Sequence, residues 1–260
     1  MRRARSLLAI WPSIVFGLVF LIVWETIVAV YDIKKFLLPA PTAIASAFAG
    51  NLENVWEAVL VTGANALVGF VLGVLLGIAV SFVLMRFSVL NELTTPLAVA
   101  INAVPIVIIV PVLNNMYPAG SQVPRRVMVV LIVFFVVLVN VAKGLRQVSG
   151  THMELMRSYA ASQREILVKT RIPNAIPYLF TAMKIAAPLS VITAFVAEYF
   201  GGTQTGLGSA ITSNASTSKN DVMWAYVLGA CLLGLSFYVA SIWLEKATKR
   251  QHGRNPVMTR

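Results

Sequence analysis

The chain has 260 residues, of which 58% are hydrophobic and 12% are charged. A water-soluble domain does not carry so much apolar surface, so lipid is expected to be its main solvent. The formal net charge of +11 does not indicate a nucleic-acid partner, because the cations lie between long apolar runs and form no clustered basic face. Anionic lipid headgroups are the expected counter-charge.

Six apolar segments approach or exceed the length that crosses a hydrocarbon core of about 30 Å. The first could be read as a cleaved signal peptide, but it is too long and lacks a small-residue cleavage site, so it is expected to remain as a helix. The sequence predicts an all-α polytopic membrane protein, with residues 1–260 as a single domain and its core at 58–245. The six predicted spans are Leu7–Val30, Ala58–Leu84, Pro96–Leu113, Val123–Ala142, Tyr178–Phe200 and Val222–Leu244.

The distribution of lysine and arginine between these spans predicts the orientation. With six spans both termini lie on the same side, and the segments on that side carry fifteen lysines and arginines against five on the other. Because positive residues are retained inside, both termini are predicted to be cytoplasmic.

The second span carries a stripe of small residues. Gly69, Gly73 and Gly77 recur every four residues. This spacing places them on one face of a helix and allows another backbone to approach closely. The pattern does not say whether that neighbour belongs to the same chain or to a second copy.

Polar or helix-breaking residues also occur at membrane depth, namely Asn102, Pro105, Asn140 and Glu198. We hypothesise that these four border the solute pathway. A carboxylate at mid-helix costs several kcal/mol, so Glu198 should face protein or water. The alternative is that Glu198 lies near the outer end of its helix and reaches the membrane interface.

The segment that follows Glu198, Gly201 to Gly208, is rich in glycine and suits a tight outer turn better than a helix. It is not a phosphate-binding loop, because no glycine in the chain is followed by the Lys-Ser or Lys-Thr pair of a Walker motif. If ATP drives this protein, a partner must hydrolyse it. No cofactor and no metal site are expected.

A polar stretch of about forty residues lies between the fourth and fifth spans. Thr151–Glu154 and Ser162–Glu165 both have the spacing of a helix-capping box, so two short helices are expected. Pro173 and Pro177 are predicted to end the second helix before the fifth span begins. An ordinary amphipathic loop is the alternative.

This stretch also resembles the EAA loop of binding-protein-dependent ABC importer permeases. Glu154 and Pro173 stand where that family has its glutamate and its proline. Other positions depart from the family pattern: Leu155 and Met156 replace two alanines, Ala160 a glycine and Ile172 a leucine.

Two further segment pairs extend the resemblance to most of the chain. Trp24-Glu25 leads to Leu38–Pro41, and Ala197–Gly201 is followed by Gly206–Gly208. Both pairs are similar to the branch of the family that serves nitrate, sulfonates, taurine, thiamine-precursor pyrimidines and riboflavin. The segment that begins at Pro177 looks closest to the vitamin-type members, whereas sulfonate, taurine or nitrate stays open.

The resemblance implies a permease of the bacterial inner membrane with three kinds of partner: a cytoplasmic ATPase subunit, a second permease chain that forms a homodimer with this one, and an extracytoplasmic solute-binding protein. The EAA loop of such permeases docks on the ATPase and couples nucleotide-driven closure to the membrane helices. By resemblance the contact residues are Tyr159, Ala160, Ala161, Ser162, Gln163 and Arg164. The outer segments 37–58 and 201–221 are expected to meet the binding protein.

Two other classes of protein compete with this interpretation. An ion-driven carrier or channel would need no ATPase. A membrane-embedded enzyme is disfavoured, because the only histidines, His152 and His252, lie on cytoplasmic segments and no span offers paired carboxylates or metal-ligand spacing.

Overall fold

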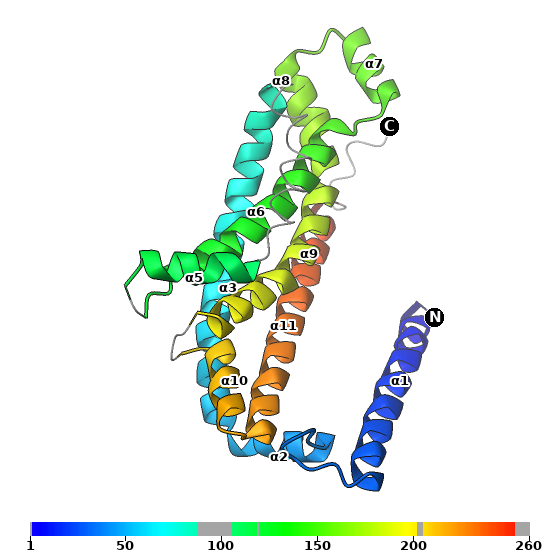
Figure 1. The fold of residues 1–260 in the computed structure, drawn as a ribbon. Coiled ribbons are helices and arrows are strands. Elements are labelled where there is room, and N and C mark those ends of the chain that lie inside the picture. Colours follow the sequence, from blue (N-terminus) through cyan, green and yellow to red (C-terminus); the bar gives the residue numbers. More distant parts are fainter. Residues whose placement is uncertain (1, 88–105, 119, 202–204, 253–260) are drawn as a thin grey trace.

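The computed structural model describes residues 2–87, 106–118, 120–201 and 205–252, and within these ranges the chain is almost entirely helical (Figure 1). The helices are α1 (Arg2–Val30), α2 (Pro41–Gly50), α3 (Leu52–Arg86), α5 (Ile106–Met116), α6 (Val123–Arg146), α7 (Gly150–Ser158), α8 (Gln163–Ile166), the π-helical η1 (Leu167–Arg171), α9 (Ile172–Tyr199), α10 (Leu207–Ser216) and α11 (Asn220–His252). The all-α fold class predicted from the sequence is confirmed.

The helices α3, α6, α9 and α11 run lengthwise and form an elongated bundle (Figure 1). The short helices α7 and α8 lie at one end of this bundle, whereas α2 and α10 lie at the other. Most of helix α1 stands apart from the bundle. Near its C-terminal end it contacts α2, and the Trp24 ring packs edge-on against Trp224 of α11, with 5.6 Å between the ring centroids. We call the end that carries α7 the α7 end, and the other the α10 end.

Four helices of the described residues are long and apolar enough to cross a membrane: Leu52–Met85, Val123–Arg146, Gln163–Tyr199 and Asn220–Thr248. They contain the second, fourth, fifth and sixth predicted spans, apart from single residues at their ends. The first predicted span lies within α1, whose described apolar part is Ile14–Val30. Most of the third, Pro96–Leu113, lies outside the described residues, and α5 covers its last part.

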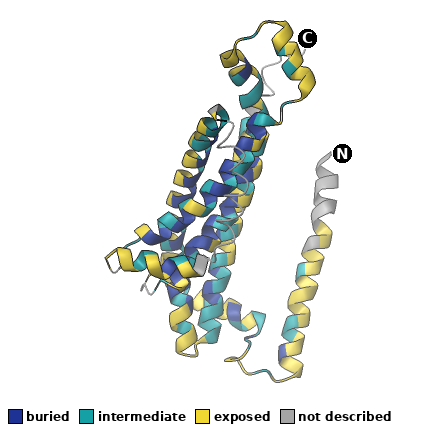
Figure 2. Ribbon diagram, turned by 45° about the horizontal axis from the view of Figure 1, so that its top comes forward, coloured by how far each residue is buried: buried dark blue, intermediate teal, exposed yellow. Residues whose placement is uncertain are grey.

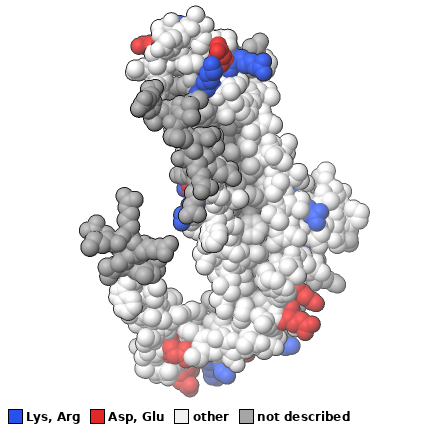
Figure 3. All heavy atoms as spheres, turned by 180° about the vertical axis from the view of Figure 1, so that it is seen from behind, with Lys and Arg blue, Asp and Glu red and all other residues white. Residues whose placement is uncertain are grey.

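Burial follows the centre of the bundle. Buried residues run along α6 and α9, whereas α1 is mostly exposed and has Val28 as its one buried residue among those described (Figure 2). On the face shown in Figure 3, charged side chains gather toward the two ends, and most of the surface between them carries none. This distribution fits a protein whose middle lies in hydrocarbon and whose ends lie in water.

The glycine stripe of α3 packs against α6 of the same chain. A Cβ at Gly69, Gly73 or Gly77 would lie 2.4, 2.7 or 2.8 Å from the Cβ of Val129, Val133 or Val137, respectively. The three valines are fully or almost fully buried. The two backbones therefore approach at three successive turns, and the neighbour that the sequence left open is intramolecular.

We expect Gly73→Ala to destabilise the permease by about 1 to 3 kcal/mol, because a methyl group there overlaps Val133 and the carbonyl of Val130 and must force α3 away from α6. Thermal unfolding in detergent measures the effect. Gly234→Ala in α11 is the matched control, since no atom lies within 4 Å of its added Cβ. Equal melting temperatures for the two variants would contradict the role of the stripe.

The prediction that Pro173 and Pro177 end the second short helix was wrong. These prolines do not interrupt the helix that begins at Gln163. Residues Gln163–Tyr199 form one continuous helical rod through η1. Proline clashes with the carbonyl four residues earlier and cannot donate to it. In the wider π turn the Ile172 N–H bonds to the Leu167 carbonyl, five residues back, and Pro173 follows directly. The π turn thus accommodates the proline without a break.

Candidate functional site

The segment that contains α7, α8 and η1, residues 149–171, is the first candidate site, and we call it the α7–α8 segment. Its first helix begins earlier than the Thr151–Glu154 spacing predicted. The N-cap is Ser149, whose side chain accepts the His152 N–H at 3.4 Å. Ser149 lies two residues before Thr151 and already accepts an N–H group of the first turn. Thr151 therefore lies inside α7 rather than at its cap.

The second capping box is present as predicted. Ser162 Oγ accepts the Glu165 N–H at 3.3 Å, and Glu165 Oε2 accepts the Ser162 N–H at 3.0 Å. Glu165 also forms an ion pair with Lys169 at 3.0 Å, one turn further on. These contacts fix the start of the rod that runs through η1 into α9.

Ala160, the residue that replaces the family's glycine, lies in the left-handed region with φ of 51°. The turn between α7 and α8 is therefore retained, at a conformational cost of about 1 to 2 kcal/mol for a residue with a Cβ. Glycine at this position would adopt the same angle without that cost.

We expect Ala160→Gly to favour the ordered α7–α8 segment by about 1 kcal/mol, because it removes this strain. Hydrogen exchange of amides 155–165 should slow by about fivefold as a result. Ala161→Gly is the control, because Ala161 has no positive φ and the added flexibility should speed exchange. Faster exchange in Ala160→Gly would contradict the strain.

Apolar side chains on α7 face water. No residue of this helix is buried, and Leu155 is 50% exposed. Tyr159, which directly follows the end of α7, is 75% exposed. The six residues named by resemblance lie together at the turn: Tyr159, Ala160, Ala161, Ser162, Gln163 and Arg164, all exposed except the half-buried Ala161. Their exposure makes Leu155 and Tyr159 candidates for a partner contact. Leu155 was missed as a candidate, because the family pattern has alanine there.

The second candidate site is a buried polar cluster at the α10 end, centred on Glu198 of α9. Glu198 is 1% exposed, so it faces protein and does not reach the membrane interface. Its Oε2 accepts the Thr62 hydroxyl of α3 at 2.7 Å and the Gly208 N–H of α10 at 3.2 Å. The Thr62 Oγ1 in turn accepts the Leu207 N–H at 2.9 Å. The carboxylate therefore caps the N-terminus of α10 and joins three helices.

Gly206 lets the chain pass directly over this carboxylate. Its φ is 98°, and a Cβ there would lie 2.4 Å from Glu198 Oε2. Only glycine satisfies both conditions, which explains the Glu198 and Gly206 spacing that the sequence singled out. The predicted outer turn ends here, since Leu207 and Gly208 already belong to α10, and the outer segment 201–221 thus contains a helix.

The N-terminus of α6 supplies the positive charge of the cluster. Arg125 is 1% exposed, and its Nη1 donates to Gln122 Oε1. Gln122 Oε1 also accepts Asn65 Nδ2 of α3 at 2.7 Å, and Asn65 Oδ1 accepts Arg126 Nε at 3.1 Å. Sequence reasoning missed Thr62, Asn65 and Arg125, because each reads as an ordinary polar residue near a span end.

Of the other three proposed pathway residues, the structure describes only Asn140. Asn102 and Pro105 lie outside the described residues. Asn140 is half-buried, and its Nδ2 donates to the Val136 carbonyl of its own helix at 2.8 Å. The described structure therefore does not bring the four together.

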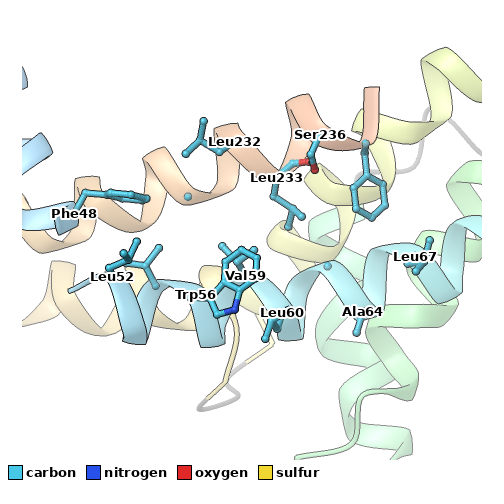
Figure 4. Close-up of a pocket in the computed structure, with 14 residues that line it drawn as sticks. Phe48, Leu52, Trp56, Val59, Leu60, Ala64, Leu67, Leu232, Leu233 and Ser236 are labelled. Carbon is cyan, nitrogen blue, oxygen red and sulfur yellow. The ribbon is translucent and has the colours of Figure 1, made fainter. Parts of the chain in front are cut away.

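An apolar groove of about 660 Å³ lies between α2, α3 and α11 (Figure 4). Trp56, Leu60 and Leu67 line it from α3, and Leu232 and Leu233 from α11. The one hydroxyl among its lining residues, that of Ser236, donates to the Leu233 carbonyl at 2.7 Å. The groove suits an apolar occupant such as a lipid chain, and it offers a polar solute almost no hydrogen-bonding partners.

The described chain has four helices long and apolar enough to cross a membrane and two short helices at one end of the bundle, and comparisons with known proteins identify the class of protein. The profile of the family described as "binding-protein-dependent transport system inner membrane component" matches residues 69–250. The chain belongs to this family, the inner-membrane permease subunits of ABC importers. It is accordingly a multi-pass protein of the inner membrane and a transport subunit.

Three curated relatives match along almost their whole length. A probable ABC transporter permease protein of Haemophilus influenzae is 28% identical, over 90% of this chain and 94% of the relative. The formylaminopyrimidine transport permease protein ThiX of Halalkalibacterium halodurans is 28% identical, over 93% of this chain and 95% of its own. The riboflavin transport system permease protein RibX of Chloroflexus aurantiacus is 26% identical, over 95% of this chain and 94% of its own.

A solved structure supports the fold. An inward-facing form of the MetNI methionine ABC transporter contains a chain that matches with a TM-score of 0.52 and 19% identity, over 75% of this chain and 94% of that chain. At this identity the likeness concerns the fold alone.

Proposed function

We propose that this permease carries a small organic solute, a vitamin-type heterocycle such as riboflavin or a thiamine-precursor pyrimidine, by alternating access driven by a separate ATPase. The observation that carries the choice of solute is that relatives named for formylaminopyrimidine and riboflavin match over more than nine-tenths of the chain. A permease named for nitrate also matches, at 21% identity over 90% of the chain, so nitrate, sulfonate and taurine are the alternative solutes.

The assembly that we propose has two copies of this chain, each a single membrane domain over residues 1–260, with both termini in the cytoplasm. The positive-inside distribution supports a cytoplasmic location for the α7 end. The exposed Leu155 and Tyr159, together with the turn at Ala160, then form the contact with the ATPase. Glu154 and Pro173 flank this contact in the family pattern.

The α10 end would then face the solute-binding protein. Helix α10 and α2 lie at this end (Figure 1), and α10 is anchored to α3 and α9 through the Glu198 cluster. Asn102, Pro105 and Asn140 remain candidates for the pathway, and so does Glu198 in a conformation that opens the cluster.

One experiment tests the assembly and the solute together. The chain is produced with the ATPase and binding protein encoded beside it, the complex is purified, and the binding protein is screened by thermal shift against riboflavin, formylaminopyrimidine, taurine, a sulfonate and nitrate. Association of an ATPase and stabilisation by riboflavin or formylaminopyrimidine support the proposal. Stabilisation by nitrate or taurine alone would overturn the choice of solute, and failure of any ATPase to associate would favour a carrier.

A further inference from the structure

One amide side chain makes two hydrogen bonds across the junction between α6 and α9 at the α7 end. Asn174, in the first turn of α9, donates through Nδ2 to the Gly144 carbonyl at 2.7 Å and to the Gln147 carbonyl at 3.1 Å. The last carbonyls of a helix have no partner within the helix. Asn174 therefore uses both N–H groups of its amide to cap the end of α6 from a different helix.

The same junction brings the two backbones into direct contact. Gly144 has no side chain, and a Cβ there would lie 2.8 Å from the Ala175 Cα and 2.9 Å from the Tyr178 Cβ. One turn after Asn174, the Tyr178 hydroxyl donates to Gln147 Oε1 at 2.9 Å. Gly144 contributes no side chain to this contact, and the Tyr178 side chain is held by its hydrogen bond to Gln147, so the contact is tightly packed.

Both ends of the α7–α8 segment are attached at this junction. The segment leaves α6 after Gln147 and returns to the bundle at Pro173. Between α7 and the start of α9 lies a groove of about 310 Å³ lined by His152, Leu155 and Asn174, among others, so α7 does not pack closely on the bundle. A displacement of α7 reaches the bundle chiefly through its two covalent ends.

The junction is connected to the rest of the bundle. Arg146 Nη2 donates to the Leu84 carbonyl of α3 at 3.1 Å, which ties a third helix to the end of α6. The rod Gln163–Tyr199 has 37 residues and carries Glu198 at its far end. At 1.5 Å per residue this rod is about 55 Å long, enough to reach from the α7–α8 segment to the α10 end.

We propose that Asn174 is a positioning residue for ATP-coupled transport: it clamps α6 to α9, so that motion of the α7–α8 segment moves both helices together instead of separating their ends. This inference rests on the proposed function, in which the α7–α8 segment contacts the ATPase. Without the clamp, the first turn of α9 separates from the end of α6 when the segment moves, and each ATP hydrolysed drives less transport.

The test compares transport with ATP turnover in vesicles that contain the permease, its ATPase and its binding protein. Uptake of labelled riboflavin or formylaminopyrimidine, whichever stabilises the binding protein, is divided by ATP hydrolysed. For Asn174→Ala and the similarly shaped Asn174→Leu we expect ATP turnover within about twofold of the unmodified complex and uptake per ATP reduced by about fivefold or more. Thr181→Ala is the control, since the Thr181 hydroxyl bonds only within α9, to the Pro177 carbonyl at 2.9 Å.

Tyr178→Phe keeps the packing and removes one hydrogen bond across the junction, so it serves if the Asn174 variants do not fold. It should lower uptake per ATP by a smaller factor. A merely structural role would lower uptake and ATP turnover in proportion, and an unchanged ratio in Asn174→Leu and Tyr178→Phe overturns the proposal. Failure of the unmodified chain to bind an ATPase is a different outcome, which overturns the proposed function itself.

Spin labels provide a second measurement that needs no solute. Lys143→Cys and Thr181→Cys place labels at exposed positions on either side of the junction, in a chain whose native Cys231 is replaced by serine. The distribution of distances between the labels should be the same in nucleotide-free and ATP-vanadate complexes. Asn174→Ala should broaden this distribution. Equal distributions with and without Asn174 would show that the clamp is dispensable.

Discussion

Replacing Glu198 with alanine is expected to prevent the permease from accumulating in folded form. The change leaves the Thr62 hydroxyl and the Gly208 N–H without their acceptor inside the protein, and it removes the only described carboxylate of a cluster that contains the buried Arg125. Unpaired buried groups of this kind cost about 3 kcal/mol or more in total. The measurement is the yield and melting temperature of the purified permease in detergent.

Glu198→Gln separates hydrogen bonding from charge. The amide oxygen can still accept from Thr62 and Gly208, so this variant should fold, with a lower melting temperature because Arg125 loses its coulombic attraction to the carboxylate. Glu53→Ala is the control, a carboxylate removed from an exposed position in the first turn of α3. A stable Glu198→Ala with lost uptake would instead assign Glu198 to the solute pathway.

The sequence predicted those features whose causes are local. The capping box at Ser162 lies within four residues, and the glycine stripe and long apolar runs follow from helix geometry alone. The Ser149 cap and the continuous path through Pro173 were mispredicted, because each depends on which of two competing local arrangements the folded chain adopts. Nothing in the local sequence decides between a helix break and a π turn.

The residues that surround Glu198 in the polar cluster could not be predicted from the sequence, for a different reason. Thr62 and Glu198 are 136 residues apart, and their contact requires α3 and α9 to be correctly placed first. The sequence did show that Glu198 had to find a polar environment at membrane depth, and it showed a glycine-rich segment after it. It could not show that the two observations have one cause, namely that Glu198 caps the helix that begins after Gly206.

Truncation of the exposed apolar pair on the α7–α8 segment should have a large effect on transport without an effect on folding. Tyr159→Ala and Leu155→Ala remove side chains that are 75% and 50% exposed, and no residue of α7 is buried, so the bundle should lose little packing. If these side chains fill pockets on the ATPase, each is worth about 2 kcal/mol of binding, or about thirtyfold in affinity, as aromatic and apolar anchors are at other interfaces. The measurement is ATPase binding to the permease in nanodiscs.

The control for this prediction is Thr151→Ala, which shortens an exposed side chain on the first turn of α7, away from the turn at Ala160. It should leave ATPase affinity and melting temperature unchanged. A melting temperature lowered by Tyr159→Ala would mean that the tyrosine packs within the permease, and an unchanged affinity would move the contact elsewhere. Weakened binding at constant stability is the combination that only a partner-facing tyrosine produces, because an exposed side chain contributes to free energy through what it touches in the assembly.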